Sequence, residues 1–156
     1  MTNPDRDREF LQRSIDLAQL AGEEGNRPFG SVVVVDDAVV AEGYNQVGST
    51  GDITAHAELV ALRSAIDEGF GERLTAATVY ASGEPCPMCT AACVWGGIGR
   101  IVFAASSAAF TEILPDGPQF RSTCAGVIAT SDAATVVDGP LLEAEALRVM
   151  GRYASP

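Results

Sequence analysis

The stretch His56-Ala57-Glu58, followed later in the chain by Pro85-Cys86-Pro87-Met88-Cys89, is the most specific pattern in this sequence of 156 residues. An imidazole and two thiolates are ligands that zinc prefers in proteins. Three such ligands leave the fourth tetrahedral position free, as in catalytic zinc sites. His56 is the only histidine in the chain, so a metal site or a catalytic triad that needs a histidine must use it.

The carboxylate of Glu58 completes the chemistry that this pattern predicts. A catalytic zinc ion lowers the pKa of its bound water to about 7. On a helix with about 100° between successive residues, Glu58 points away from the direction of His56 and is free to move protons. We therefore predict that His56, Cys86 and Cys89 bind zinc and that Glu58 is the catalytic acid and base.

Two other interpretations of the cysteines are weaker. A redox pair would leave His56 and Glu58 without a role. A structural zinc site needs a fourth protein ligand, but Cys93 lies two helical turns beyond Cys86, roughly 10 Å along a helix axis. The remaining cysteine, Cys124, lies in a separate segment, and we predict that Cys93 and Cys124 are small buried apolar residues.

Length and composition favour one compact domain over residues 1–156. A hydrophobic content of 47% is sufficient for a core. The first residues carry mixed charge where a signal peptide would have a basic end and an apolar run, and no apolar stretch reaches the roughly 18 residues of a membrane span. We therefore expect a cytoplasmic protein without a membrane partner.

The charge distribution argues against a nucleic-acid partner. The formal net charge is −11, and the ten basic residues are all arginines that are never adjacent in the sequence. Proteins that bind nucleic acids usually gather their basic residues into a patch. The same acidic exterior could also serve solubility alone, which is compatible with any small-molecule substrate.

Helix and strand patterns alternate along the chain, which predicts an α/β fold with helices on both sides of a sheet. The first expected helix starts near residue 10 and ends near residues 22–25. Further helices are expected at 55–68, where Asp52 or Thr54 would be the N-cap, at 87–96 and at 141–150. Strands are expected at 30–35, 38–42, 77–81, 100–104 and 127–129.

The motif and the order of these elements together make residues 8–153 resemble the cytidine and deoxycytidylate deaminase superfamily. Within this superfamily, they resemble the branch that contains bacterial guanine deaminases and tRNA adenosine deaminases. The resemblance implies a three-layer α/β/α domain with a five-stranded mixed sheet. It also implies one zinc ion per chain, held between the starts of the second and third helices, and a homodimer.

Further resemblances favour the guanine deaminase side and suggest substrate contacts. Pro28-Phe29-Gly30 and Val94-Trp95 resemble segments of that group, so Phe29 and Trp95 could line a pocket for the base, although core packing explains buried aromatics equally well. Asn45 matches a substrate-contacting asparagine of the family, and its alternative is a turn residue.

The resemblance also implies a second carboxylate and a lid. Asp116 is nearly at the position of an acid that guanine deaminases use, although Pro115-Asp116-Gly117 is also an ordinary turn signal, and Glu112 is a second candidate. Tyr153 lies in a C-terminal tail that could cover the substrate; the alternative is a frayed terminus.

The sequence thus predicts a zinc-dependent hydrolytic deaminase of a free nucleobase or related aminated heterocycle, with guanine-like rings first and cytosine-like or triazine-like rings as further possibilities. A tRNA adenosine deaminase is the alternative within the family. A non-catalytic zinc-stabilised binding module is the alternative from a different class.

Overall fold

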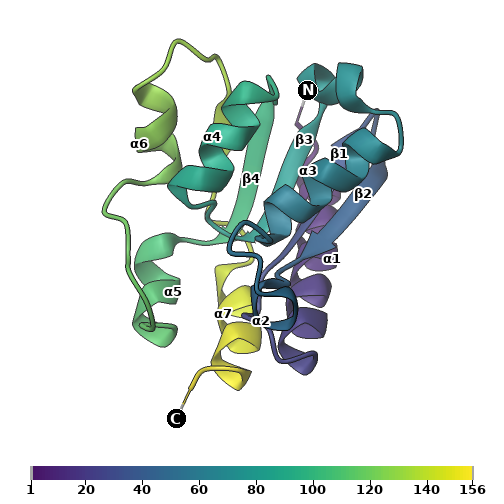
Figure 1. The fold of residues 1–156 in the computed structure, drawn as a ribbon. Helices are drawn as coiled ribbons and strands as arrows, with labels where there is room; N and C mark the ends of the chain where they lie inside the picture. Colours follow the sequence, from purple (N-terminus) through teal and green to yellow (C-terminus); the bar gives the residue numbers. More distant parts are fainter. Residues whose placement is uncertain (1, 156) are drawn as a thin grey trace.

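A mixed sheet of five strands forms the centre of the computed structural model, which describes residues 2–155 (Figure 1). The strand order is β2-β1-β3-β4-β5, with bounds Ala38–Tyr44, Gly30–Val35, Thr78–Gly83, Arg100–Ala105 and Val136–Asp138. Strand β1 pairs antiparallel with both β2 and β3, whereas β3, β4 and β5 are parallel. The predicted α/β fold with a five-stranded mixed sheet is confirmed.

Helices cover both faces of this sheet. Helices α1 (Pro4–Glu23) and α7 (Glu143–Arg152) pack on one face, and α3 (Ala57–Asp67), α4 (Pro87–Trp95) and α6 (Cys124–Ala129) pack on the other (Figure 1). The remaining short helices are α2 (Val47–Thr50), the 3-10 helix η1 (Gly71–Ala76) and α5 (Ser107–Ile113). Because both faces are covered, the central strands are apolar on both sides.

Strand β1 shows how the sequence divides its core between the two faces. Val32 and Val34 belong to the cluster under α1 and α7, whereas Val33 and Val35 belong to the cluster under α3 and α4. Side chains alternate between the faces of a strand, so four consecutive valines supply both layers. This explains why the strand reads as a continuous apolar run.

The prediction of a strand at residues 127–129 is wrong, because these residues end helix α6. The side chain of Thr123 accepts a hydrogen bond from the backbone N–H of Gly126 and caps this helix. The fifth strand is instead β5, which has only three residues. A strand this short and partly exposed gives little alternating pattern in the sequence.

The sequence patterns also missed α2, α5 and η1 and placed the start of α3 too early. Helix α3 begins at Ala57 with His56 as its N-cap residue, so neither Asp52 nor Thr54 caps it. Asp52 instead accepts hydrogen bonds from the backbone N–H and the hydroxyl of Thr54, which forms a turn ahead of the helix. None of the helices within residues 2–155 is long and apolar enough to cross a membrane.

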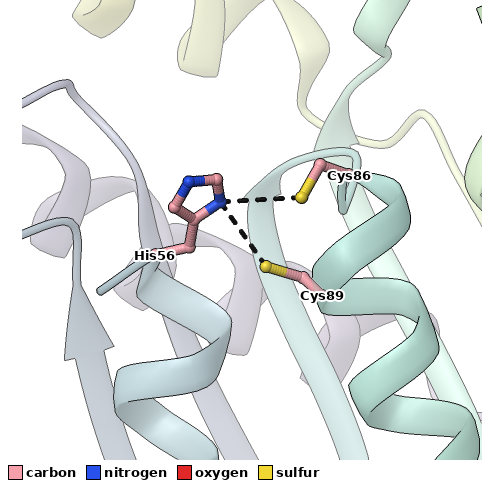
Figure 2. Close-up of side chains that lie close together, drawn as sticks. All are labelled: His56, Cys86 and Cys89. Carbon is pink, nitrogen blue, oxygen red and sulfur yellow. Dashed lines mark hydrogen bonds between the residues drawn. The ribbon is translucent and has the colours of Figure 1, made fainter. Parts of the chain in front are cut away.

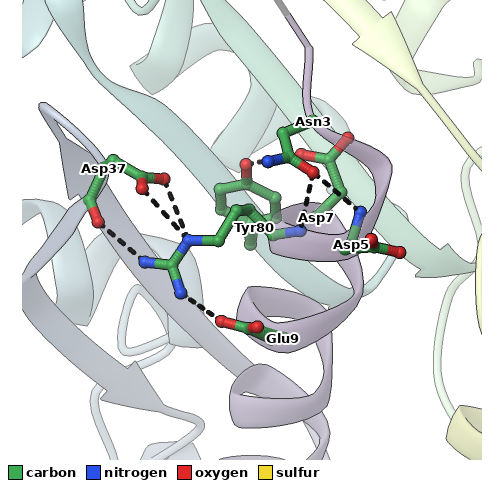
Figure 3. A network of polar contacts seen from close by, with 7 residues as sticks. Asn3, Asp5, Asp7, Glu9, Asp37 and Tyr80 are labelled. Carbon is green, nitrogen blue, oxygen red and sulfur yellow. Dashed lines mark hydrogen bonds and ion pairs between the residues drawn. The ribbon is translucent and has the colours of Figure 1, made fainter.

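A buried ion pair joins the start of α1 to the sheet, at the end of the strands where β3 and β4 begin. Asp7 accepts two hydrogen bonds from the guanidinium of Arg100, at 2.7 and 2.9 Å, and a third from the hydroxyl of Tyr80 at 2.7 Å. Figure 3 shows Asp7 and Tyr80 side by side near Asn3. The hydrogen bonds from Arg100 lower the pKa of Asp7 despite its burial.

We expect the substitution Asp7→Asn to lower the free energy of unfolding by about 3 kcal/mol, because it leaves the charge of Arg100 partly uncompensated in a buried place. Urea denaturation measures this change. The matched control is Glu42→Gln in the half-exposed pair with Arg13, which we expect to cost less than about 1 kcal/mol.

The effect of Asp7→Asn depends on pH in a defined direction. The folded-state pKa of Asp7 is lowered, so its contribution is complete above the unfolded value of about 4 and is lost as the pH falls through the folded value. The difference in stability between the wild type and Asp7→Asn must therefore shrink in acid. A constant difference down to about pH 2 would contradict this assignment.

Candidate active site

Three predicted zinc ligands come together where helices α3 and α4 begin. The Nδ1 atom of His56 lies 3.6 Å from the Sγ atom of Cys86 and 3.6 Å from that of Cys89 (Figure 2). All three ligand atoms lie within 4.8 Å of one another, and they are the group of possible metal ligands found among residues 2–155. The structure thus brings together residues from two separate helix starts.

The spacing of these atoms fits zinc. With bonds of about 2.3 Å to sulfur and about 2.05 Å to nitrogen, tetrahedral geometry places nitrogen and sulfur about 3.6 Å apart. The two distances from His56 have this value. His56, Cys86 and Cys89 supply three ligands, and the described residues provide no fourth His, Cys, Asp or Glu ligand within the same distance. Such a site leaves one coordination position open.

Local structure prepares the two cysteines for a metal. Cys86 is the N-cap residue of α4, Pro87 follows as its first residue, and Cys89 lies in the first turn. The N-terminal end of a helix favours negative charge. A hydrogen bond with Cys89 lowers the pKa of Cys86 to about 4, with a further contribution from His56. The hydrogen bond with Cys86 and burial raise the pKa of Cys89.

Glu58 lies beside this group without belonging to it. Glu58 is the second residue of α3, and only 6% of its surface is exposed. This burial raises the pKa of its carboxyl group to about 7. A carboxyl group with a pKa near neutrality can both accept and donate a proton at the same pH. Its place next to the ligands agrees with the predicted role of Glu58 as an acid and base.

The other two cysteines are core residues. Cys93 and Cys124 are both buried, at 0% and 1% exposure, in the apolar cluster beneath α3, α4 and α6. Neither is part of the group of possible metal ligands. The prediction that they are small buried residues is therefore confirmed.

Phe29 lies next to the segment that leads to the cysteines. Its ring meets the ring of Phe110 edge to face, with centroids 5.2 Å apart. Both rings rest on Gly83, the last residue of β3, where an added Cβ atom would lie 2.7 Å from Phe29 and 3.2 Å from Phe110. Only glycine fits between these rings and the strand. Phe110 was not among the predicted contacts, because a single aromatic residue in a helix of mostly small residues gives no periodic signal in the sequence.

Asn45 occupies the turn that follows β2. Its backbone N–H donates to the carbonyl of Phe29 at 3.0 Å, and its side-chain oxygen accepts from the backbone N–H of Val47 at 3.1 Å. The next residue, Gln46, donates to the carbonyl of Ala55 at 3.0 Å, directly before His56. Asn45 is thus a turn residue, as one interpretation predicted, in a turn that connects Phe29 with the segment before His56.

The two candidate second carboxylates are both exposed. Glu112 lies on α5, and Asp116 lies in the loop that follows it. Gly117 has a φ of 84°, which agrees with the turn interpretation of Asp116. Neither carboxylate joins the group formed by the zinc ligands.

Two further aromatic residues, Trp95 and Tyr153, were predicted to contact the substrate. Trp95 ends α4, roughly 13 Å along the helix axis from Cys86 at its start, and is 89% exposed. Core packing of Trp95 is therefore wrong, whereas its contact with a base stays a prediction. Tyr153 packs against Gly22 of α1, where an added Cβ would meet its ring. The role of Tyr153 in a lid over the substrate stays a prediction.

A buried carboxylate that the sequence analysis overlooked directly precedes the cysteine motif. Glu84 is 8% exposed and accepts hydrogen bonds from the first residues of α5 and α6, Ser107 and Cys124. Its position next to Pro85 and Cys86 was the available signal, but its partners lie too far along the chain to be inferred from sequence.

Comparison with known proteins places this site in a family. The family model described as "Cytidine and deoxycytidylate deaminase zinc-binding region" matches residues 4–105, which include His56, Glu58, Cys86 and Cys89.

The similar proteins include both a guanine deaminase and a tRNA-specific adenosine deaminase. A guanine deaminase of Bacillus subtilis (strain 168) is 41% identical over 97 residues, which cover 62% of this chain and 62% of that protein. A tRNA-specific adenosine deaminase of Buchnera aphidicola subsp. Schizaphis graminum is 38% identical over 101 residues, which cover 65% of this chain and 67% of that protein. The matches thus span about three-fifths to two-thirds of the length of these relatives.

A solved structure extends the likeness over almost the whole fold. A mutant of NE0047 in complex with 8-azaguanine superposes with a TM-score of 0.82 at 26% identity, covering 94% of this chain and 84% of that one. With the family model matched over the metal ligands, this chain belongs to the cytidine and deoxycytidylate deaminase family.

Proposed function

We propose that this protein is a zinc-dependent hydrolytic deaminase of a free nucleobase or a related aminated heterocycle, with guanine-like rings as the first candidates. Membership of the deaminase family supports the hydrolysis of a C–N bond. The observation that carries the proposal is the group of three ligand atoms with zinc spacing, beside the buried carboxyl of Glu58.

The residues of the site have separate tasks in this reaction. His56, Cys86 and Cys89 would hold one zinc ion per chain, which when bound lowers the pKa of water to about 7 and so supplies hydroxide. Glu58 takes the proton from that water and passes it to the ring nitrogen. As this happens, the oxygen of that water bonds to the ring carbon. Glu58 then takes the second proton from the added hydroxyl group and passes it to the exocyclic amine, which leaves as ammonia and gives the oxo ring.

Flat, uncharged rings suit the rest of the site. Phe29 and Phe110 supply an aromatic surface next to Gly83, and Asn45 lies in the adjoining turn with polar groups for the edge of a base. The net charge of −11 and the separated arginines disfavour a polyanion. The guanine deaminase relative and the 8-azaguanine complex of NE0047 support a purine-like base.

The proposal also covers the assembly of the chain with a second copy and the residues that could close over the substrate. We expect a homodimer in the cytoplasm, and the exposed Trp95 favours a contact with another chain at the end of α4. Glu112 on α5 and Asp116 in the loop after it are the candidates for a second carboxylate that contacts the substrate. Tyr153 is the candidate for a lid residue, and its ring lies at Gly22 of α1.

A tRNA adenosine deaminase is the second candidate function. Its support is the relative of that name, which matches at nearly the same identity as the guanine deaminase. An RNA substrate would require binding to phosphates, and that binding weakens steeply with salt. A non-catalytic zinc module would be expected to saturate its zinc with protein ligands and would not need Glu58.

The first test is metal content. We expect about one zinc ion per chain in the purified protein, and we expect His56→Ala and Cys86→Ala to lose zinc and activity together, because two ligands make a poor site. Elemental analysis by mass spectrometry measures the zinc. The matched control is Cys93→Ala, which should keep it, since Cys93 is a core residue. Full occupancy in either ligand variant would remove the assignment.

The second test separates chemistry from metal binding. We expect Glu58→Gln to retain zinc and fold while its turnover falls by at least about a hundredfold, because the amide cannot transfer the protons. Ammonia release measures turnover, and zinc content is determined on the same sample. Turnover near the wild-type value would overturn the mechanism.

The third test identifies the substrate. We expect ammonia release from free bases to exceed release from nucleosides and RNA in a screen of guanine, adenine, cytosine, their nucleosides and amino-triazines. A gel shift with a tRNA stem-loop at several salt concentrations tests the second candidate. Binding tighter than about 1 μM that weakens with salt would favour the tRNA deaminase instead.

A further inference from the structure

Glu84 makes an unusual set of contacts for the residue that precedes a metal motif. One carboxylate oxygen accepts from the backbone N–H of Ser107 at 2.9 Å and from its hydroxyl at 3.2 Å. The other oxygen accepts from the backbone N–H of Cys124 at 2.8 Å. The backbone N–H of Glu84 itself donates to the carbonyl of Ala105 at 2.8 Å. Glu84 thus joins four segments at one buried point.

Only a carboxylate can make these contacts from this position. Ser107 and Cys124 are the first residues of α5 and α6, so each oxygen faces N–H groups at the start of a helix. A glutamine would present an amide N–H to one of the two backbone N–H groups, and one contact would become repulsive. The two helix starts therefore depend on the same charged group.

The elements held by Glu84 contact the cysteine helix α4 and the end of strand β3. Helix α5 carries Phe110, whose ring lies against Phe29 and Gly83. Helix α6 packs against α4, the helix whose first turn contains Cys86 and Cys89. The segment between these helices, residues 114–123, has no helix or strand of its own. Glu84 thus bonds to the first residue of the helix before this segment and to the residue that directly follows the segment.

The geometry points to Glu84 as a positioning residue for substrate binding: its carboxylate holds α5 and α6 against the cysteine loop and so keeps Phe110 in place beside Phe29. This inference rests on the proposed deaminase function. A purely structural cap would change stability and leave the affinity for a ring unchanged. A positioning residue instead raises the KM for the substrate while kcat changes less.

The experiment compares Glu84→Gln with the wild type on the best ring found in the substrate screen. We expect KM to rise at least about tenfold and kcat to fall by less than about threefold, because the aromatic surface is displaced while Glu58 and the ligands remain. We also expect unchanged zinc content and faster hydrogen exchange at the amide of Ser107 or Cys124. The exchange measurement requires no substrate.

A second variant tests the same contact from the other side. Ser107→Pro removes the backbone N–H and the hydroxyl that bond to Glu84, and proline is tolerated as the first residue of a helix. The preceding Ser106 has an extended backbone, which is the conformation that a following proline requires. We expect the same rise in KM, and the double variant should lose little more than either single variant.

The matched control is Glu143→Gln. Glu143 in α7 accepts a hydrogen bond from the backbone N–H of Ser106 at 2.8 Å, at the same end of α5, but it has no link to the cysteine loop or α6. We expect its KM to stay within about threefold of the wild type. A rise in KM for Glu143→Gln equal to that for Glu84→Gln would overturn the inference. Loss of any hydrogen bond at the start of α5 would then be sufficient to raise KM, and Glu84 would have no special role.

Other outcomes separate this inference from the proposed function. If Glu84→Gln loses activity only in proportion to lost zinc, Glu84 supports the metal and the inference is wrong. If Glu84→Gln does not fold, Ser107→Pro decides, and a wild-type KM there overturns the inference. If the wild type deaminates no ring, the proposed function fails, while faster amide exchange in Glu84→Gln with retained zinc still supports the positioning of α5 and α6.

Discussion

The site depends on one geometric requirement: the first turns of α3 and α4 must meet at ligand distance. His56 precedes α3 and the cysteines open α4, and the 3.6 Å distances between their ligand atoms leave little tolerance. Helix α3 is held in place by direct backbone contact with β2 at Gly43. An added Cβ there would lie 2.5 Å from the carbonyl of Ala57 and from the amide of Ala61. The helix therefore sits as close to the sheet as a glycine permits.

The sheet also sets the position of α4 relative to α3. Strand β1 lies between β2, which carries α3, and β3, which leads into the cysteine loop. The pairing of Ser31 with both Gly43 and Ala81 fixes the register across these three strands. A shift of one residue would turn every side chain to the opposite face and would also move the cysteines relative to His56. The approach of His56 to the two cysteines thus depends on sheet register.

The sequence predicted the parts of this arrangement that are local. The ligands and Glu58 were recognisable because the residues of each half lie within a few positions of one another, and the long apolar strands because their pattern persists over several residues. Strand β5 was not recognisable, because its three residues depend on pairing with β4 for their conformation. Glu84 and Phe110 were missed for a related reason. Their roles depend on partners that are close in space but distant in the chain.

The residues for the reaction are also local in the sequence, whereas the residues that select the substrate are not. His56, Glu58 and the cysteines suit any ring that loses ammonia by hydrolysis, so they cannot select among rings by themselves. Selection requires contacts with the rest of the ring, and we propose that other segments supply them, such as Phe29 after α1 and Phe110 on α5, whose rings contact each other. Such segments can vary without disturbing the ligands, provided that something fixes them to the cysteine loop. Glu84, the buried carboxylate one residue before Pro85, makes such a connection, because it accepts hydrogen bonds from the first residues of α5 and α6.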